Sequence, residues 1–209
     1  MIYTLLAMTK LDLYKELKSE YVTPTTPAIV KTGKGKYLTV IGEGDPNGEI
    51  FQRAIAALYS VAYTIKMAKK FHGGVDYKVC ALEGLWDIVE DGETIADRNR
   101  WRWKLMIRVP DFIHATDLRA ATKQLIEKGK PEDVRAVQLE ALKEGPCVQV
   151  LHVGPYSEEG PTIERMREFA ASKGLEFRGL HHEIYLSDPR RTKPERLRTI
   201  LRCPVGASA

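Results

Sequence analysis

The stretch HHEIYLSDPR, which begins at His181, alternates ionisable and aromatic residues with aliphatic ones. As a β-strand it would direct His181, Glu183 and Tyr185 to one face of a sheet, and His182 and Ile184 to the other. Partial burial raises the pKa of a glutamate, because a poorly solvated site disfavours the charged carboxylate. The pattern therefore favours Glu183 as a general base, with Tyr185 beside it in a catalytic role.

The surroundings of this strand decide whether Glu183 is available for chemistry. If Ile184 and Leu186 pack beneath helices, Glu183 faces away from that core and into an enclosed space. A structural role stays open, since the same carboxylate could form an ion pair with Arg190 or Arg198.

His181 is a candidate ligand-binding residue, although a histidine beside a strand is often a structural hydrogen-bonding group. We find no carboxylate or cysteine at metal-ligand spacing from the histidine pair. The sequence therefore predicts no metal site there.

Three tryptophans form a second group of candidates. Trp101 and Trp103 share one face of a predicted strand, and Trp86 ends the strand before it. Aromatic faces offer a large contact area to flat, hydrophobic or cationic molecules. Each ring could pack in the core instead, but we expect Trp86 and at least one of the other two to line a cavity with Glu183.

Two further residues are predicted to face a ligand. Tyr156, within HVGPYSEEG, follows a strand and would stand at the rim of a pocket. Glu83 occupies a strand position in the first half of the chain that could mirror Glu183, although a one-residue change of register would turn it to the other face.

The elements that must position these residues occur twice along the chain. Each half contains a strand that ends in a glycine-rich turn, then an amphipathic helix, then two strands. This repeat predicts an α+β fold of two β-α-β-β modules related by a pseudo-twofold axis. We place the modules at residues 36–113 and 146–205, with an N-terminal extension over 1–35 and a linking helix and connector over 114–145.

Composition excludes several classes of function. The chain has 209 residues, of which 44% are hydrophobic, so it can bury a substantial core. The net charge is +4, and because basic residues alternate with acidic ones we expect no nucleic-acid partner. No apolar run reaches the roughly 20 residues of a membrane span. The N-terminus lacks the features of a signal peptide, which predicts a cytoplasmic protein. We expect buried free thiols at Cys80, Cys147 and Cys203.

Several motifs in a fixed order resemble one known family. EGLW and RWRWKLMIRVPDF in the first half, with HVGPYSEEGPTIERM and HHEIYLSDPRRTKPERLRTILR in the second, are similar to the GyrI-like small-molecule-binding family. The resemblance runs from about Pro27 to Val205 and is to the stand-alone form without a DNA-binding domain. It implies SHS2-like modules whose sheets form a ligand cleft with the helices on the outer side. It also implies a cleft glutamate in the third strand of the second module, which matches Glu183.

The resemblance leaves two functions open. In the first, the protein hydrolyses cyclopropane-bearing compounds for detoxification: Glu183 deprotonates a water, and a Tyr or Trp donor polarises the substrate carbonyl. Ring strain favours this opening, so the resemblance implies no cofactor. In the second, the protein sequesters hydrophobic or cationic molecules without turnover, with Glu183 as counter-charge. EGLW and HHEIYLSDP resemble the hydrolytic branch more closely, which favours an enzyme. The sequence indicates neither the natural ligand nor the oligomeric state.

Overall fold

A computed structural model describes residues 10–208 of the chain, except for 73, 91, 92 and 95. Residues 1–9, with which the segment used for the signal-peptide interpretation begins, lie outside the described residues. Of the described helices, none combines the length and the apolar character that crossing a membrane requires.

In the described part of the chain, nine antiparallel strands form one sheet. Its order is β1-β8-β11-β10-β3-β6-β2-β7, and β9 pairs with β11. The strands of this sheet are β1 (Ala28–Lys31), β2 (Lys34–Glu43), β3 (Leu82–Asp87), β6 (Arg102–Val109), β7 (Gln138–Lys143), β8 (Pro146–Val153), β9 (Leu175–Phe177), β10 (His181–Tyr185) and β11 (Arg198–Ala207). A separate pair consists of β4 (Val89–Glu90) and β5 (Glu93–Thr94).

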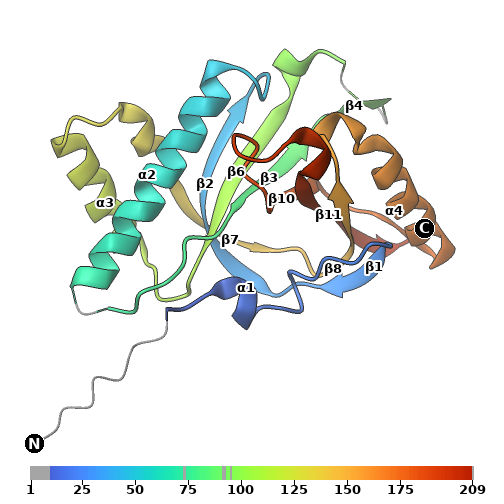
Figure 1. The fold of residues 1–209 in the computed structure, drawn as a ribbon, viewed down its shortest axis with the longest axis horizontal. Coiled ribbons are helices and arrows are strands. Elements are labelled where there is room, and N and C mark those ends of the chain that lie inside the picture. Colours follow the sequence, from blue (N-terminus) through green and yellow to red (C-terminus); the bar gives the residue numbers. More distant parts are fainter. Residues whose placement is uncertain (1–9, 73, 91–92, 95, 209) are drawn as a thin grey trace, which may run out of the picture.

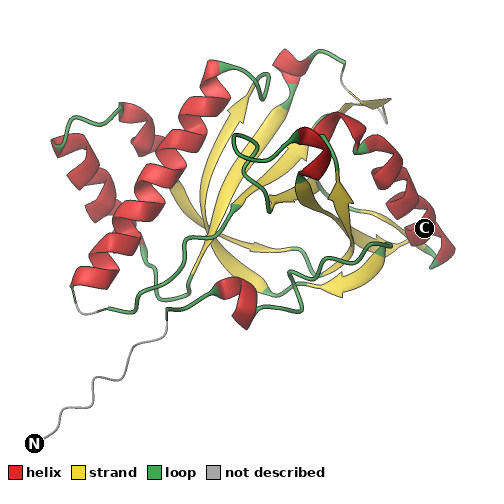
Figure 2. Ribbon diagram, viewed as in Figure 1, coloured by secondary structure: helices red, strands yellow, loops and turns green. Residues whose placement is uncertain are grey.

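The helices flank this sheet, which occupies the centre of the molecule (Figure 2). They are α1 (Leu13–Glu16), α2 (Glu49–Phe71), α3 (Ala115–Glu127) and α4 (Gly160–Ser172). Short 3₁₀-helical turns are η1 (Arg98–Arg100), η2 (Glu132–Ala136), η3 (Tyr156–Glu158) and η4 (Pro194–Arg196). The apolar residues of α2 recur at helical spacing and bury one face of that helix. Figure 1 shows α2 and α4 at opposite ends of the sheet.

The sheet consists of two halves with the same element order. The first half is β2-α2-β3-β6 and the second is β8-α4-β10-β11. In space the strands run β8-β11-β10 and then β3-β6-β2, so the halves meet where β10 pairs with β3. This arrangement confirms the predicted α+β fold of two β-α-β-β units. The boundaries that we gave to the modules stay a prediction.

Adjacent residues of β10 face two different layers of the molecule. Leu201, the register partner of Glu183, packs in the apolar cluster beneath α4, and Tyr185 packs at the edge of the core beneath α2. On the opposite face, Ile184 packs with Tyr21 of the N-terminal segment. The condition that Ile184 and Leu186 pack beneath helices is met only by the short α1, whose Tyr14 joins this cluster, because the N-terminal segment supplies the apolar cover of that face. Glu183 instead shares a face with α2 and α4.

Candidate functional site

Glu183 lies in the middle of β10 with a side chain that is 12% exposed. It forms an ion pair with His181, whose Nε2 atom is 3.5 Å from Oε1 of Glu183, and it also interacts with the side chains of Tyr185 and Glu159. Arg190 forms an ion pair with Asp188 instead. Arg198 is aligned in register with the face that carries Ile184, so its side chain does not face Glu183. Neither of the two arginines that the sequence offered as ion-pair partners therefore neutralises the Glu183 carboxylate.

Tyr185 and Trp86 form a hydrogen-bonded aromatic pair beside Glu183. The Nε1 atom of Trp86 donates to the hydroxyl oxygen of Tyr185 at 3.1 Å. Gly84, the register partner of Glu183, leaves room for this pair, because a Cβ there would lie 3.0 Å from each of the two bonded atoms. Burial and then the nearby Glu183 carboxylate raise the pKa of Tyr185, so the hydroxyl keeps its proton and can donate it.

The turn before α4 brings two more side chains over β10. Tyr156 in η3 is 38% exposed, and its ring stands edge-on to Tyr185 with centroids 5.7 Å apart. Burial and then Glu183 raise the pKa of Tyr156 to about 12. Tyr156 therefore lies beside Tyr185, and its position at the rim of a pocket stays a prediction.

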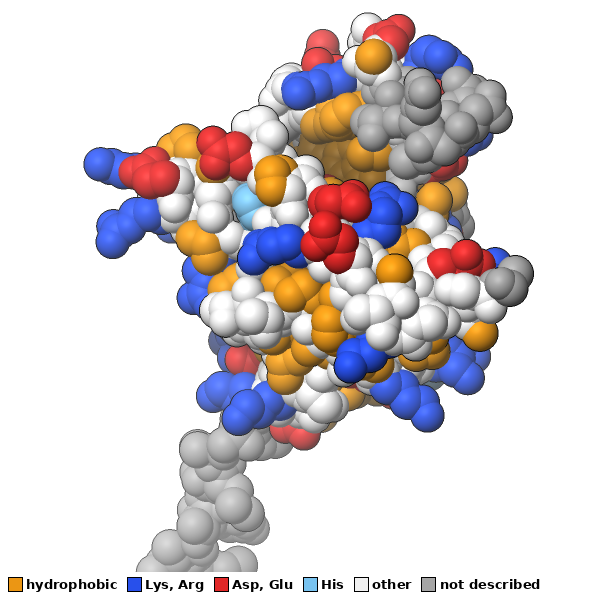
Figure 3. All heavy atoms as spheres, turned by 90° about the vertical axis from the view of Figure 1, so that its right-hand side faces the viewer, with side chains coloured by type: hydrophobic (Ala, Val, Ile, Leu, Met, Phe, Trp, Pro, Cys, Tyr) orange, Lys and Arg blue, Asp and Glu red, His pale blue; other side chains and the backbone are white. Residues whose placement is uncertain are grey.

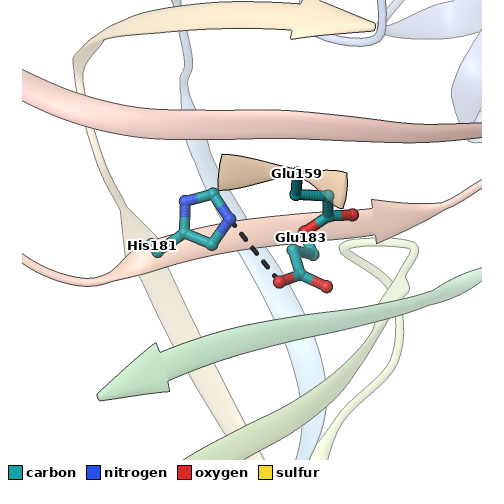
Figure 4. Close-up of side chains that lie close together, drawn as sticks. All are labelled: Glu159, His181 and Glu183. Carbon is teal, nitrogen blue, oxygen red and sulfur yellow. Dashed lines mark ion pairs between the residues drawn. The ribbon is translucent and has the colours of Figure 1, made fainter. Parts of the chain in front are cut away.

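Glu159, the residue that precedes α4, is a member of the site that sequence reasoning missed. It is only 5% exposed, and its Oε1 atom has no hydrogen-bond partner among the described residues. Figure 4 shows its carboxyl group next to that of Glu183. Burial and then the charge of Glu183 raise the pKa of Glu159 to about 9. Glu159 therefore keeps its proton at neutral pH.

His181 is held from its other side by a cysteine. Its Nδ1 atom is 3.3 Å from Sγ of Cys203, and its Nε2 atom points toward Glu183 (Figure 4). Burial alone would lower the pKa of His181, but Cys203 and Glu183 together raise it to about 10. The prediction of buried free thiols is confirmed for all three cysteines.

The tryptophans separate into a site residue and core residues. Trp103 is 2% exposed, donates from Nε1 to the carbonyl oxygen of Gly44 at 3.2 Å and packs edge-on against Phe51, so it belongs to the core beneath α2. Trp101 meets the ring of Trp86 edge-on at 6.1 Å. The structure therefore brings Trp86 to the site, and places Trp101 against it.

Glu83 lies on the opposite face of the sheet from Glu183. It is the register partner of Ile184, is completely buried, and accepts a hydrogen bond from the Tyr21 hydroxyl at 3.2 Å. His182 lies 3.0 Å from its other carboxylate oxygen. The predicted mirror of Glu183 is therefore wrong, because an offset of one residue turns Glu83 away from the site.

The surface near α4 provides an apolar recess. Figure 3 views the molecule from the side on which α4 lies in Figure 1. This face is hollowed near its top, and hydrophobic side chains lie inside the hollow, with charged side chains above and below it. Such a surface suits a hydrophobic small molecule with a few polar groups.

Comparison with known proteins identifies the family. The model of the GyrI-like small molecule binding domain matches residues 25–205. Two crystal structures from Listeria innocua, one of a hydrolase and one of an uncharacterized conserved protein, are each 40% identical to the chain. Both cover 94% of this chain and 100% of their own, with TM-scores of 0.85 and 0.89. The chain therefore belongs to the family of GyrI-like small-molecule-binding domains.

A more distant structure shares the fold alone. The C-terminal domain of EcmrR is 11% identical, with a TM-score of 0.56 over 88% of this chain and 98% of its own. A search of curated proteins gave no match.

Proposed function

We propose that the protein hydrolyses flat, hydrophobic compounds that carry a strained, electrophilic cyclopropane ring, and so detoxifies alkylating agents. The observation that carries this proposal is the placement of Glu183. Its carboxylate shares a sheet face with Tyr185 and Trp86, and the arginines near it in sequence are engaged or directed elsewhere. A mostly buried carboxylate beside aromatic rings and a hydroxyl donor is suited to activate a water molecule.

In the proposed reaction Glu183 removes a proton from a water molecule as the water oxygen bonds to a carbon of the cyclopropane. The strained carbon–carbon bond breaks, and its electron pair moves through the conjugated ring to the substrate carbonyl, which becomes a phenolate. The Tyr185 hydroxyl donates a hydrogen bond to that developing negative charge. Its oxygen accepts from Trp86 and its hydroxyl also interacts with the Glu183 carboxylate, so in the reaction its proton would turn from Glu183 to the substrate oxygen.

The family supports the binding half of this proposal and one relative supports the hydrolytic half. The family model describes a small-molecule-binding domain over most of the chain. A Listeria innocua protein that is 40% identical over 94% of the chain is a hydrolase. We extend both statements to this chain and add the substrate class, which rests on the motifs around Trp86 and Glu183.

Sequestration of lipophilic cations without turnover is the alternative function. The adjacent carboxyl groups of Glu159 and Glu183 favour it, because a cation would compensate their charge while aromatic rings cover its apolar parts. The same residues would then bind and not react.

The substitution Glu183→Gln separates these functions. For the hydrolase we expect turnover of a cyclopropane-bearing alkylating compound to fall by about 100-fold or more while binding persists, because glutamine keeps the shape but accepts no proton. Hydrolysis in ¹⁸O-labelled water should place the label in the product. For the binder, wild type shows no turnover, and the variant loses affinity for a cation far more than for a matched neutral compound. Wild-type turnover in the variant would exclude the role of Glu183 as base.

The exposed neighbour Glu158 offers a matched control. Glu158→Gln makes the same chemical change in η3, the turn that also contains Tyr156. We expect this variant to keep wild-type turnover. A fall in melting temperature of Glu183→Gln with normal turnover would instead indicate a structural ion pair with His181.

A further inference from the structure

Three potential metal ligands meet on the face of β10 that carries Glu183. His181 and Glu183 are two residues apart on one strand, and Glu159 reaches them from the start of α4. One donor atom of each residue lies within 4.8 Å of the other two. Figure 4 shows the three side chains around a common point. Two sequence-distant elements therefore build one donor set of two carboxylates and one imidazole.

Two of these donor atoms lack a hydrogen-bond partner within the described part of the chain. They are Oε1 of Glu159, a residue only 5% exposed, and the buried Nε2 atom of His181, whose contact with Glu183 is a 3.5 Å ion pair and not a hydrogen bond. Such buried polar atoms are costly unless something pairs with them. Since the Nδ1 atom of His181 faces Cys203, the nitrogen that points into the cluster is Nε2, which meets Glu183 at the ion-pair distance of 3.5 Å. The centre of the cluster therefore calls for a positive charge, either a proton or a metal ion.

The ligand types and spacing fit a transition metal. Zinc binds imidazole nitrogen and carboxylate oxygen at about 2.0–2.2 Å, so neighbouring ligand atoms of a tetrahedral site are roughly 3.3 Å apart. Nε2 of His181 and Oε1 of Glu183 are already 3.5 Å apart. Three protein ligands with one open position is the arrangement of catalytic zinc sites, whereas Mg²⁺ and Ca²⁺ prefer oxygen ligands alone.

We propose that Glu159, His181 and Glu183 bind one divalent transition-metal ion, with Zn²⁺ as the best match. This site does not depend on the proposed hydrolysis. An ion held by Glu183 would occupy the carboxylate that serves as general base, so the metal-bound and the hydrolytic protein would be alternative states of one site. Binding must also release protons, because a metal ligates only the deprotonated carboxylate and imidazole.

Calorimetric titration of Zn²⁺ into the full-length, metal-stripped protein tests the site. We expect one ion per chain, and heats that differ between two buffers of different ionisation enthalpy because protons are released. Glu159→Gln should weaken binding by more than about 100-fold, since even outer-shell changes cost 10- to 100-fold. Glu158→Gln, the exposed neighbour, should keep wild-type affinity. Circular dichroism and thermal unfolding verify that both variants fold.

The outcomes separate this proposal from the proposed function. Absence of Zn²⁺ binding, or equal affinity in Glu159→Gln and wild type, would overturn the metal site and leave the hydrolase untouched. Tight binding that depends on Glu159 would support the site even if the protein hydrolyses nothing. If hydrolysis is present, saturating Zn²⁺ should also suppress it in wild type.

Discussion

The two faces of β10 carry buried charges that are matched to different degrees. On one face, His182 lies 3.0 Å from carboxylate oxygens of both Glu83 and Glu144. Arg202 pairs with the second oxygen of Glu144 at 3.2 Å and donates to Gln149 at 2.7 Å. Both basic side chains of this cluster are almost completely buried, and both carboxylates meet a partner.

On the other face, His181 meets two carboxyl groups, those of Glu159 and Glu183. Three buried polar atoms on this face make no hydrogen bond within the described chain: Oε1 of Glu159, Nε2 of His181 and Oγ1 of Thr199. The comparison teaches that burial alone does not mark a functional group. A buried charge with a full set of partners specifies the fold, whereas one left short of partners is prepared to receive a ligand, a proton or an ion. The predictions below test this contrast.

The largest effect on stability should come from Arg202→Met. Removing the guanidinium leaves Glu144 buried beside His182 with one partner fewer, and breaking a buried pair costs about 3–5 kcal/mol. Urea unfolding measures this loss. The control is Arg198→Met, which lies on the same face of β11 but at the exposed start of the strand, and for it we expect a change below about 0.5 kcal/mol. Equal losses of unfolding free energy in the two variants would show that the buried ion pairs of Arg202 do not stabilise the fold.

The same cluster should make stability fall in acid. Burial alone would raise the pKa of Glu144, but His182 and Arg202 lower it from 4.5 to about 2. The carboxylate therefore contributes stability that is complete above pH 4.5 and is lost as pH falls toward 2. At about 1.4 kcal/mol per pKa unit this contribution is about 3 kcal/mol. Glu144→Gln should flatten the curve of unfolding free energy between these pH values, and an unchanged slope would contradict the assignment.

On the functional face, Trp86→Phe should weaken ligand binding by about 2- to 10-fold, the value of one neutral hydrogen bond. The substitution removes the donor to Tyr185 and keeps an aromatic ring. We also expect a flat hydrophobic cation to quench wild-type tryptophan fluorescence and to lose most of that effect in the variant. Trp103→Phe in the core is the matched control. Stronger loss of quenching in the control would show that we have chosen the wrong tryptophan.

The smallest effect should come from Gly84→Ala. Its Cβ would lie 3.0 Å from the bonded atoms of Trp86 and Tyr185, so this pair must move by a few tenths of an ångström. We expect turnover to fall several-fold with little change in melting temperature. Gly160→Ala, at a position where a Cβ meets open space, should leave turnover unchanged. A normal rate for Gly84→Ala would show that the Trp86–Tyr185 geometry is not needed.

Alternation and repetition were enough to predict much of this structure. The pattern of β10 indicated that Glu183 and Tyr185 share a face, and the repeated element order indicated two β-α-β-β units. Both properties are local or arise from a periodic pattern, so one sequence contains them. The prediction for Glu83 was wrong for a related reason. Side chains of a strand alternate between two faces, so an error of one residue in the register places a side chain on the wrong face.

The remaining features depend on contacts between distant segments. Glu159 follows Glu158 in an acidic turn and looks like an exposed surface residue, and only the packing of α4 and its preceding turn on the sheet buries it. The cover over Ile184 comes from Tyr21 in a segment that we regarded as an extension. Glu144 reaches His182 from the connector between the two halves. No local sequence pattern predicts these contacts, because they form only when distant segments assemble into the sheet.

The most direct test of the contrast between the two faces of β10 compares two variants, Glu183→Gln and Glu83→Gln. The measurement is the rate at which each folded variant hydrolyses a cyclopropane-bearing alkylating compound. Both substitutions neutralise one mostly buried glutamate, and the two residues lie on opposite faces of paired strands. We predict a rate about 100-fold or more below wild type for Glu183→Gln. For Glu83→Gln we predict a normal rate and a lower unfolding free energy. A wild-type rate for folded Glu183→Gln, or the larger loss of rate for Glu83→Gln, would contradict the account.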